Sequence, residues 1–159
     1  MSAMTLTTEG DRYVLVTRRF AAPPEFVYKA HTDADLMKQW MLGPEGWTMP
    51  VCINEARAGG RIRCEWTNGA EGFYLTGEYV EVDPPHRTVH IERMHLPDPT
   101  PDNRVETRFE PDGTGTLLRM RMTLPDAATR AAMLGTGMDV GMEASYARLE
   151  SLLQSSAAS

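Results

Sequence analysis

The chain has 159 residues, of which 42% are hydrophobic and 24% are charged. These values suit one globular domain with a buried core. The formal net charge of -6 argues against nucleic acid or an anionic membrane as a partner, because both usually require a basic surface. No apolar run approaches the roughly 20 residues that span a bilayer, and the first residues lack the basic patch and apolar run of a signal peptide. We therefore expect a cytoplasmic protein.

The first part of the chain predicts one strand and two short helices. Residues 12–20, "RYVLVTRRF", are rich in β-branched and aromatic residues and predict the strand, which leaves residues 1–11 as an N-terminal tail. Ala-Pro-Pro-Glu at 22–25 favours a helix start, because proline is tolerated in a first turn and an acidic residue there complements the helix dipole. Asp33 is a suitable cap for a second helix over residues 34–40, "ADLMKQW".

The middle of the chain, from residue 48 to 124, has the pattern of antiparallel strands joined by turns. Proline cannot donate to a strand ladder, so "DPPHR" at 83–87 separates two strands. "PDGTG" at 111–115 is a strong hairpin signal. The clearest strand patterns cover residues 61–66, 72–82, 87–95, 104–110 and 116–124.

The last part of the chain changes to a helical period. From Pro125 onward the apolar residues predict a helix that runs to about Leu153, followed by a tail at 154–159. The order of elements therefore predicts an α+β domain over residues 12–153. Six or seven antiparallel strands would form a curved sheet, and only the last helix is long enough to cover its apolar face.

Several glycines lie inside these predicted elements. Gly135, Gly137 and Gly141 each cost a helix roughly 1 kcal/mol relative to alanine. Either the helix begins later, or another element packs closely against them. Gly77, inside a predicted strand, similarly indicates a bend, a bulge or close packing. We expect Gly77 and at least one of Gly137 and Gly141 to mark a close approach between helix and sheet.

Four segments of the chain point to a known family when they are taken in order: "FAAPPEFVYKAHTDADLMKQWMLGPEGW", "EARAGGRIR", "GEYVEVDPPHR" and "GMEASYARLESLL". Together they resemble the activator of heat-shock-protein-90 ATPase homologue-like family of the START/birch-pollen-allergen (SRPBCC) superfamily. The resemblance covers about residues 12 to 153 and implies the helix-grip fold, in which a curved antiparallel sheet wraps a long C-terminal helix. A cavity usually lies between them. Members bind varied apolar molecules, a few catalyse reactions, and the eukaryotic namesakes bind a chaperone.

Two positions differ from what the resemblance leads us to expect. At the positions of Trp40 and Met41, members of the family commonly have two aromatic residues, and at the position of Met142 they often have a tryptophan. Methionine replaces a bulky ring at Met41 and at Met142. Because thioether side chains adapt to irregular shapes, the cavity implied by the resemblance would be more plastic here.

The candidate ligand-binding residues are those expected to line that cavity. His90 and Glu92 share one face of a predicted strand and could orient a ligand or move a proton. The alternative is that this face is the solvated outer side of the sheet. Little in the lining could pair a strong charge, so the ligand should be neutral or weakly polar. The full set is Trp66, Tyr74, His90, Glu92, Met120, Met122, Met138 and Met142.

Other chemistries find no support in the sequence. Cys52 and Cys64 lack CxxC spacing and paired histidines, so we expect no metal and interpret them as free thiols, with a redox pair as the alternative. No GxSxG, GxGxxG or Walker pattern occurs. We expect no cofactor, and no catalytic residue can be named.

Three functions remain open. The first is binding of a small hydrophobic or aromatic molecule. The second is a cyclase-like or isomerase-like enzyme that uses acid-base residues in the cavity. The third is a protein-interaction module, by analogy with the co-chaperone namesakes. Binding is favoured because polar residues are sparse in the proposed lining. A homodimer and a chaperone contact are possible partners.

Overall fold

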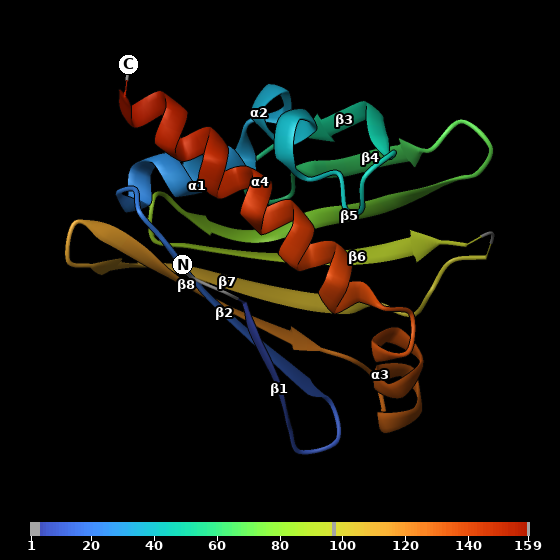
Figure 1. The fold of residues 1–159 in the computed structure, drawn as a ribbon. Helices are drawn as coiled ribbons and strands as arrows, with labels where there is room; N and C mark the ends of the chain where they lie inside the picture. The colour runs from blue at the N-terminus through green and yellow to red at the C-terminus, as the bar shows by residue number, and fades with distance from the viewer. Residues whose placement is uncertain (1–3, 97, 159) are drawn as a thin grey trace.

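The computed structural model describes residues 4–96 and 98–158, and within them the chain forms eight strands and four helices around one antiparallel sheet (Figure 1). The strand order is β1-β2-β8-β7-β6-β5-β4-β3. In chain order the elements are β1 (Thr5–Glu9), β2 (Tyr13–Phe20), α1 (Pro24–Thr32), α2 (Ala34–Trp40), β3 (Thr48–Asn54), β4 (Arg61–Thr67), β5 (Gly72–Asp83), β6 (Arg87–His95), β7 (Asn103–Asp112), β8 (Gly115–Thr123), α3 (Ala127–Leu134) and α4 (Met138–Ala158).

The expected α+β class is confirmed, with a long C-terminal helix crossing one face of the curved sheet (Figure 1). The sheet has one strand more than the six or seven expected. Residues 5–9, which were assigned to a tail, form β1 and pair with β2 from Thr5 opposite Thr17 to Glu9 opposite Tyr13. The polar run "TLTTE" gave no strand signal, so pairing with β2 determines its conformation. None of the described helices combines the length and apolar character that a membrane-spanning helix needs.

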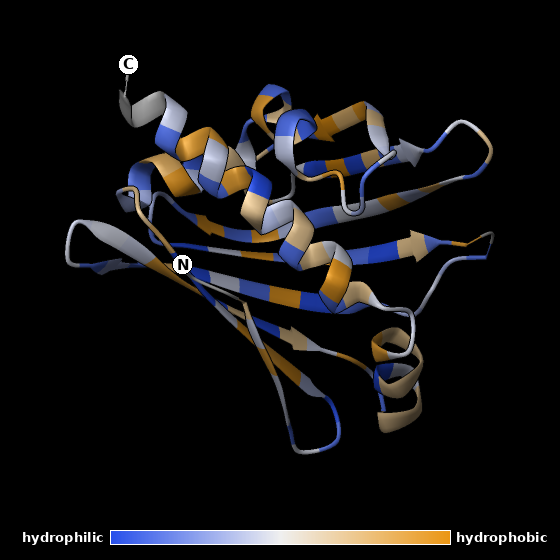
Figure 2. Ribbon diagram, in the orientation of Figure 1, coloured by the Kyte–Doolittle hydropathy of each residue, from blue (hydrophilic) through white to orange (hydrophobic). Residues whose placement is uncertain are grey.

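The strand registers show which side chains face the helices. Val14 lies opposite Met122, which lies opposite Val105, and Val105 in turn lies opposite His90. Side chains directly opposite one another point to the same face of a sheet. The concave face is therefore that of the fully buried Val14 and Val105, and His90 belongs to it. Apolar and polar residues alternate along parts of several strands (Figure 2), and successive side chains of a strand point to opposite faces of the sheet.

Two apolar clusters fill the concave side. The first joins β2, β7, β8, α1 and α4, with Phe20, Phe109 and Leu149 among its buried members. The second joins α2 to β3, β4 and β5, with Met37 and Ile62 among its members. Truncating a buried leucine or phenylalanine typically costs about 2–5 kcal/mol, so both clusters contribute strongly to holding the helices on the sheet.

A buried arginine joins α4 to the sheet. Arg18 points inward from β2 with only 4% of its surface exposed. Its guanidinium lies 3.1 Å from a carboxylate oxygen of Glu150 and 3.6 Å from one of Glu143. Glu150 also accepts a hydrogen bond from the backbone N–H of Ala21, and Glu143 accepts one from the N–H of Met4. These contacts bind two turns of α4 to the first strands.

The last helical region is divided in two. Asp126 caps α3 by accepting from the N–H of Thr129, and the helix ends at Gly135. Gly137 has a φ of 81°, which favours glycine, and α4 starts at the next residue. The alternative in which the long helix begins later is therefore correct. It also extends to Ala158, beyond the expected end at Leu153.

The expectation that Gly77 and either Gly137 or Gly141 mark a close approach between helix and sheet is wrong. A Cβ on Gly77 would lie 2.2 Å from the carbonyl oxygen of Ile91, so the close contact is with the neighbouring strand β6. A Cβ on Gly141 would meet only Pro44 Cδ at 3.7 Å, an ordinary contact, and one on Gly137 would meet nothing within 4 Å. The irregularity of β5 lies between Tyr79 and Glu81, further along the strand than Gly77.

Replacing Gly77 and Gly141 by alanine should have opposite effects on stability. Gly77→Ala should lower the free energy of unfolding by about 1–3 kcal/mol, because the new methyl group collides with rigid backbone. Gly141→Ala should raise it by about 0.4–1 kcal/mol, because alanine restricts the unfolded chain and fits the helix. Urea unfolding of both variants measures this. Equal stability of the Gly77→Ala variant and the wild type would show that the strands relax around the methyl group.

Candidate functional site

The candidate site lies at the centre of the concave face, on β6, between the two apolar clusters. His90 and Glu92 both point inward there, so the alternative that they lie on the outer face is wrong. The Nε2 atom of His90 lies 2.7 Å from a carboxylate oxygen of Glu92. The side chains are 18% and 22% exposed. The pair is thus shielded from bulk water but still reachable, as a site for a small molecule requires.

One polar group next to this pair has unused hydrogen-bonding capacity. Asn103 lies directly opposite Glu92 on β7, and its Oδ1 atom is buried without a hydrogen-bond partner among the described residues. Thr88 and Thr107 lie opposite each other one position further along the same face, and both are buried. On the other side, Gly77 lies opposite Glu92 and contributes no side chain. We name His90, Glu92, Asn103, Thr88 and Thr107 the polar seam.

Methionines lie between the polar seam and α4. Met120 and Met122 point inward from β8, where Met122 is buried and Met120 half-buried. Met138 and Met142, on the first turns of α4, are half-buried and pack against the first cluster. The structure thus brings four of the predicted methionines to one side of the seam.

The two predicted aromatic residues lie on opposite faces of the sheet. Trp66 is buried in the second cluster, and its indole N–H donates to the carbonyl of Met41. The prediction for Tyr74 is wrong in its direction. Tyr74 is stacked on His95 of β6 at 4.2 Å, with Arg63 over its ring, on the outer face. In the β4–β5 register Trp66 lies opposite Phe73, so the next residue, Tyr74, points to the other face of the sheet. The sequence alone did not fix that register.

Several inward-facing groups were missed by the sequence analysis. Arg18 could have been found, because it alternates with the apolar Val16 and Phe20 and so shares their buried face. Tyr146 of α4 stacks on Trp40, and burial raises the pKa of its hydroxyl. The hydroxyl of Tyr79, which donates to Asn54, has its pKa raised to about 12 by burial.

His31 is a second inward-facing histidine that was not predicted as a site residue. It lies on α1 between the rings of Trp40 and Phe109. Its Nδ1 atom is 2.8 Å from the carbonyl oxygen of Val27, which can only accept, so Nδ1 carries the proton. Nε2 is then a buried acceptor without a partner in the described structure. Burial of the imidazole lowers the pKa of His31 to about 4 despite the hydrogen bond to Val27.

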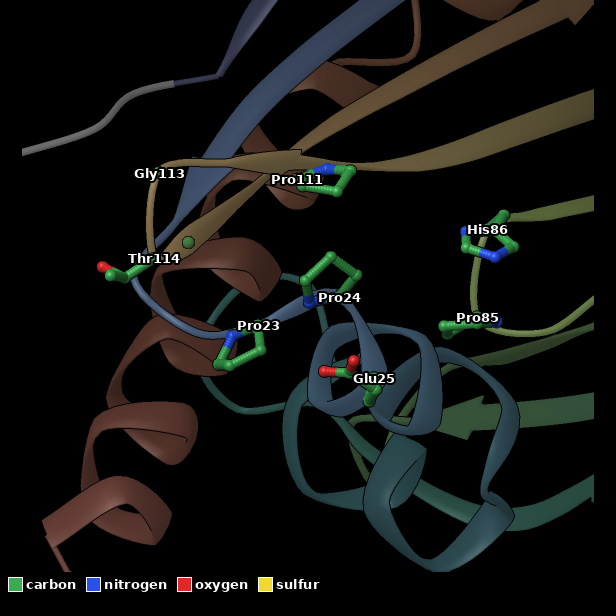
Figure 3. A pocket seen from close by; sticks show the side chains of 9 residues that line it. Pro23, Pro24, Glu25, Pro85, His86, Pro111, Gly113 and Thr114 are labelled. Carbon is green, nitrogen blue, oxygen red and sulfur yellow. The ribbon is translucent and has the colours of Figure 1, made fainter.

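Two pockets of about 430 and 440 Å³ are present in the described part of the chain, and neither lies between α4 and the sheet. The first lies at one end of the molecule, where Pro23, Pro24 and Glu25 face the turn with Pro85 and His86 and the turn after Pro111 (Figure 3). The second is bordered by Trp47, Glu71, Gly72, Phe73, His95 and Leu96. The expected cavity beneath α4 is therefore not one of these preformed pockets.

The sequence of the chain matches one known protein family over most of its length. The sequence profile of the family described as "Activator of Hsp90 ATPase homolog 1-like protein" matches residues 21–154. The chain belongs to this family. The match includes the whole of β6 and β7, the two strands that carry the polar seam. The resemblance seen in the four sequence segments is thereby confirmed.

Solved structures of several bacterial proteins share the fold of this chain. One from Rhodobacter sphaeroides is 28% identical, with a TM-score of 0.90, over 96% of this chain and 99% of the other. One from Mycobacterium smegmatis is 21% identical, with a TM-score of 0.85, over 94% and 95%. One from Chromobacterium violaceum is 25% identical, with a TM-score of 0.74, over 89% and 96%. No curated protein is significantly similar to the chain.

His31 should make the stability of this family member depend on pH. Its pKa is about 4 in the folded protein and about 6.5 in an unfolded chain. The unfolded state therefore binds the proton first, and stability is lost as the pH falls from about 6.5 towards 4, by roughly 3 kcal/mol. In His31→Gln this residue cannot titrate. The slope of the unfolding free energy against pH over that range should therefore be smaller, by an amount that corresponds to the uptake of up to one proton. Urea unfolding at several pH values measures both slopes, and parallel curves would contradict the low pKa.

Proposed function

We propose that this protein binds a small, neutral and largely apolar molecule between α4 and the concave face of the sheet. The observation that carries the proposal is the polar seam itself. Hydrogen-bonding groups lie half-buried in the middle of an inward face whose two flanks are apolar. Ligand sites commonly combine an apolar lining with a few polar groups that fix orientation.

The polarity of the ligand follows from the charges that are already paired. The Arg18 guanidinium contacts the carboxylates of Glu143 and Glu150, although its Nε atom has no hydrogen-bond partner among the described residues, and His90 is hydrogen-bonded to Glu92. A charged ligand would have to compete with these contacts, and an unpaired charge is costly to bury. A neutral ligand with one hydrogen-bonding group could instead satisfy Asn103, whose side-chain oxygen lacks a partner.

Room for the ligand would come from movement of side chains, because neither of the two pockets described above lies beneath α4. The two halves of the helix differ in burial. Leu149 and Leu153 are buried, whereas Met138 and Met142 are only half-buried. Unbranched thioether side chains can adopt alternative packings at little cost. The ligand would therefore enter at the methionine-bearing first turns of α4.

A bulky residue at Met120 should block ligand binding. Met120 lies opposite Thr107 on the concave face, so Met120→Trp fills the space next to the seam. Arg121→Trp is the matched control, because the neighbouring residue on the same strand is exposed and faces outward. We expect the fluorescence of Nile red, a neutral apolar dye, to rise with wild type and Arg121→Trp, and the apparent affinity to fall at least tenfold in Met120→Trp.

Equal dye binding by all three proteins would overturn this location for the site. Met120→Trp must remain folded for the comparison, and circular dichroism with a thermal melt checks this. His90→Phe, with His95→Phe as its outer-face control, tests the seam separately. Native mass spectrometry of the protein purified from its own host would show whether a ligand is retained.

A second candidate function is acid-base catalysis on the bound molecule. It is favoured by one observation, the 2.7 Å hydrogen bond between His90 and Glu92 in a half-buried setting. A carboxylate that orients an imidazole is a common arrangement for proton transfer. Glu92→Gln keeps the shape of the side chain but removes its charge. Under this candidate, Glu92→Gln should still bind the retained ligand but lose its conversion or its deuterium exchange with solvent. Unchanged exchange would exclude proton transfer by this pair.

A protein-interaction role has less support. The large apolar side chains with the greatest exposure are Phe26, Val80, Leu96 and Val140. They belong to α1, β5, the loop after β6 and α4, respectively. Single exposed apolar residues are normal on protein surfaces, whereas docking surfaces usually present a contiguous patch.

A further inference from the structure

Three sulfur atoms meet at the edge of the second cluster. Cys52 of β3 and Cys64 of β4 lie directly opposite each other on the concave face, and their Sγ atoms are 3.9 Å apart. The Sδ atom of Met37, on α2, lies 4.0 Å from the Sγ atom of Cys52. The chain thus assembles three soft donors from two strands and a helix, from positions far apart in the sequence.

The two sulfur–sulfur distances that involve Cys52 match those between ligands around one metal ion. A thiolate-to-metal bond for a first-row ion such as zinc is about 2.3 Å. Three sulfurs at that distance, arranged in a trigonal plane, are separated from one another by about 4.0 Å by simple trigonometry from the same bond length. The two separations that involve Cys52, 3.9 and 4.0 Å, agree with this value.

We propose that Cys52, Cys64 and Met37 form a three-coordinate site for monovalent copper. Two thiolates and a thioether are soft ligands, and such sets select Cu(I). The described residues contain no group of three or more histidine, cysteine or acidic side chains that could hold a metal. The proposed site therefore depends on the thioether of Met37 as its third ligand. Divalent zinc normally requires four ligands, with nitrogen or sulfur donors predominating.

The surroundings suit a metal site that can be loaded from solvent. Cys64 and Met37 are buried, whereas Cys52 is half-buried on β3, which is an edge strand of the sheet. Cys52 is the more exposed of the two thiols and would therefore capture the ion first. Cys64 would then lose its proton as its bond to copper forms, so that binding releases protons in total without any change of oxidation state.

This inference does not depend on the proposed ligand site, because its residues and its test are separate. The sequence analysis expected no metal, since the cysteines lack CxxC spacing. The twelve-residue separation becomes irrelevant once β3 and β4 pair. A disulfide between the two cysteines is the competing interpretation, and it would leave Met37 without a role.

The test is a competition for Cu(I) between the reduced full-length protein and a colorimetric Cu(I) chelator, without oxygen. The wild type should withhold one equivalent of copper. Cys52→Ser and Cys64→Ala should each weaken the affinity at least a hundredfold, and Met37→Leu about tenfold, in line with the loss reported generally for a weakened metal environment. Met133→Leu, a half-buried methionine of α3 in the other cluster, is the matched control and should bind like the wild type.

X-ray absorption at the copper edge of the wild-type complex should show sulfur neighbours alone. This second measurement remains informative if a cysteine variant unfolds. Failure of the reduced wild type to compete for copper would overturn the proposal. Equal affinity of wild type and Met37→Leu would also overturn it, as would nitrogen or oxygen scattering from the bound ion.

Discussion

A single buried guanidinium, that of Arg18, determines where the long helix lies on the sheet. The charge cannot be left alone in the interior, because breaking a buried ion pair by removing one partner typically costs about 3–5 kcal/mol. Glu143 and Glu150 are seven residues apart and therefore lie on the same side of α4. Their contacts with Arg18, and with the backbone of Met4 and Ala21, fix both the position and the rotation of the helix. Leu149 and Tyr146 are then directed towards the sheet.

This anchoring divides α4 into two halves that are held on the sheet in different ways. The half beyond Glu143 is held by charge and by buried apolar side chains, whereas the first turns carry half-buried methionines next to a glycine-containing break. The polar seam lies on the neighbouring strands β6 and β7, where neither apolar cluster covers it completely. A fold in which one end of the covering helix is firm and the other adaptable is suited to admitting a guest molecule without losing its core.

The fold could be predicted well from the sequence, and the site only in part. Strand alternation, the proline stop after Asp83 and the late helical period were local signals, and they gave the correct class and element order. β1 was missed because its residues are polar and its strand exists only through pairing with β2. His90 and Glu92 were correctly paired on one face, but which face was concave depended on registers between distant strands. Tyr74 was misplaced for this reason. Arg18 and Asn103 carried weaker signals, since a polar residue within an alternating strand is visible but its partner is not.

The strand order also bears on how the protein avoids self-association. An open sheet leaves two outer strands with unpaired backbone groups, which in principle could recruit the same strand of another molecule. β3 is one of these, and its register with β4 shifts between Thr48 and Val51, around Pro50. Proline offers no N–H, and an irregular edge cannot extend a ladder. The edge strand β3 is therefore unsuited to pairing with a strand of another molecule. This leaves β1 as the regular edge strand through which two molecules could pair.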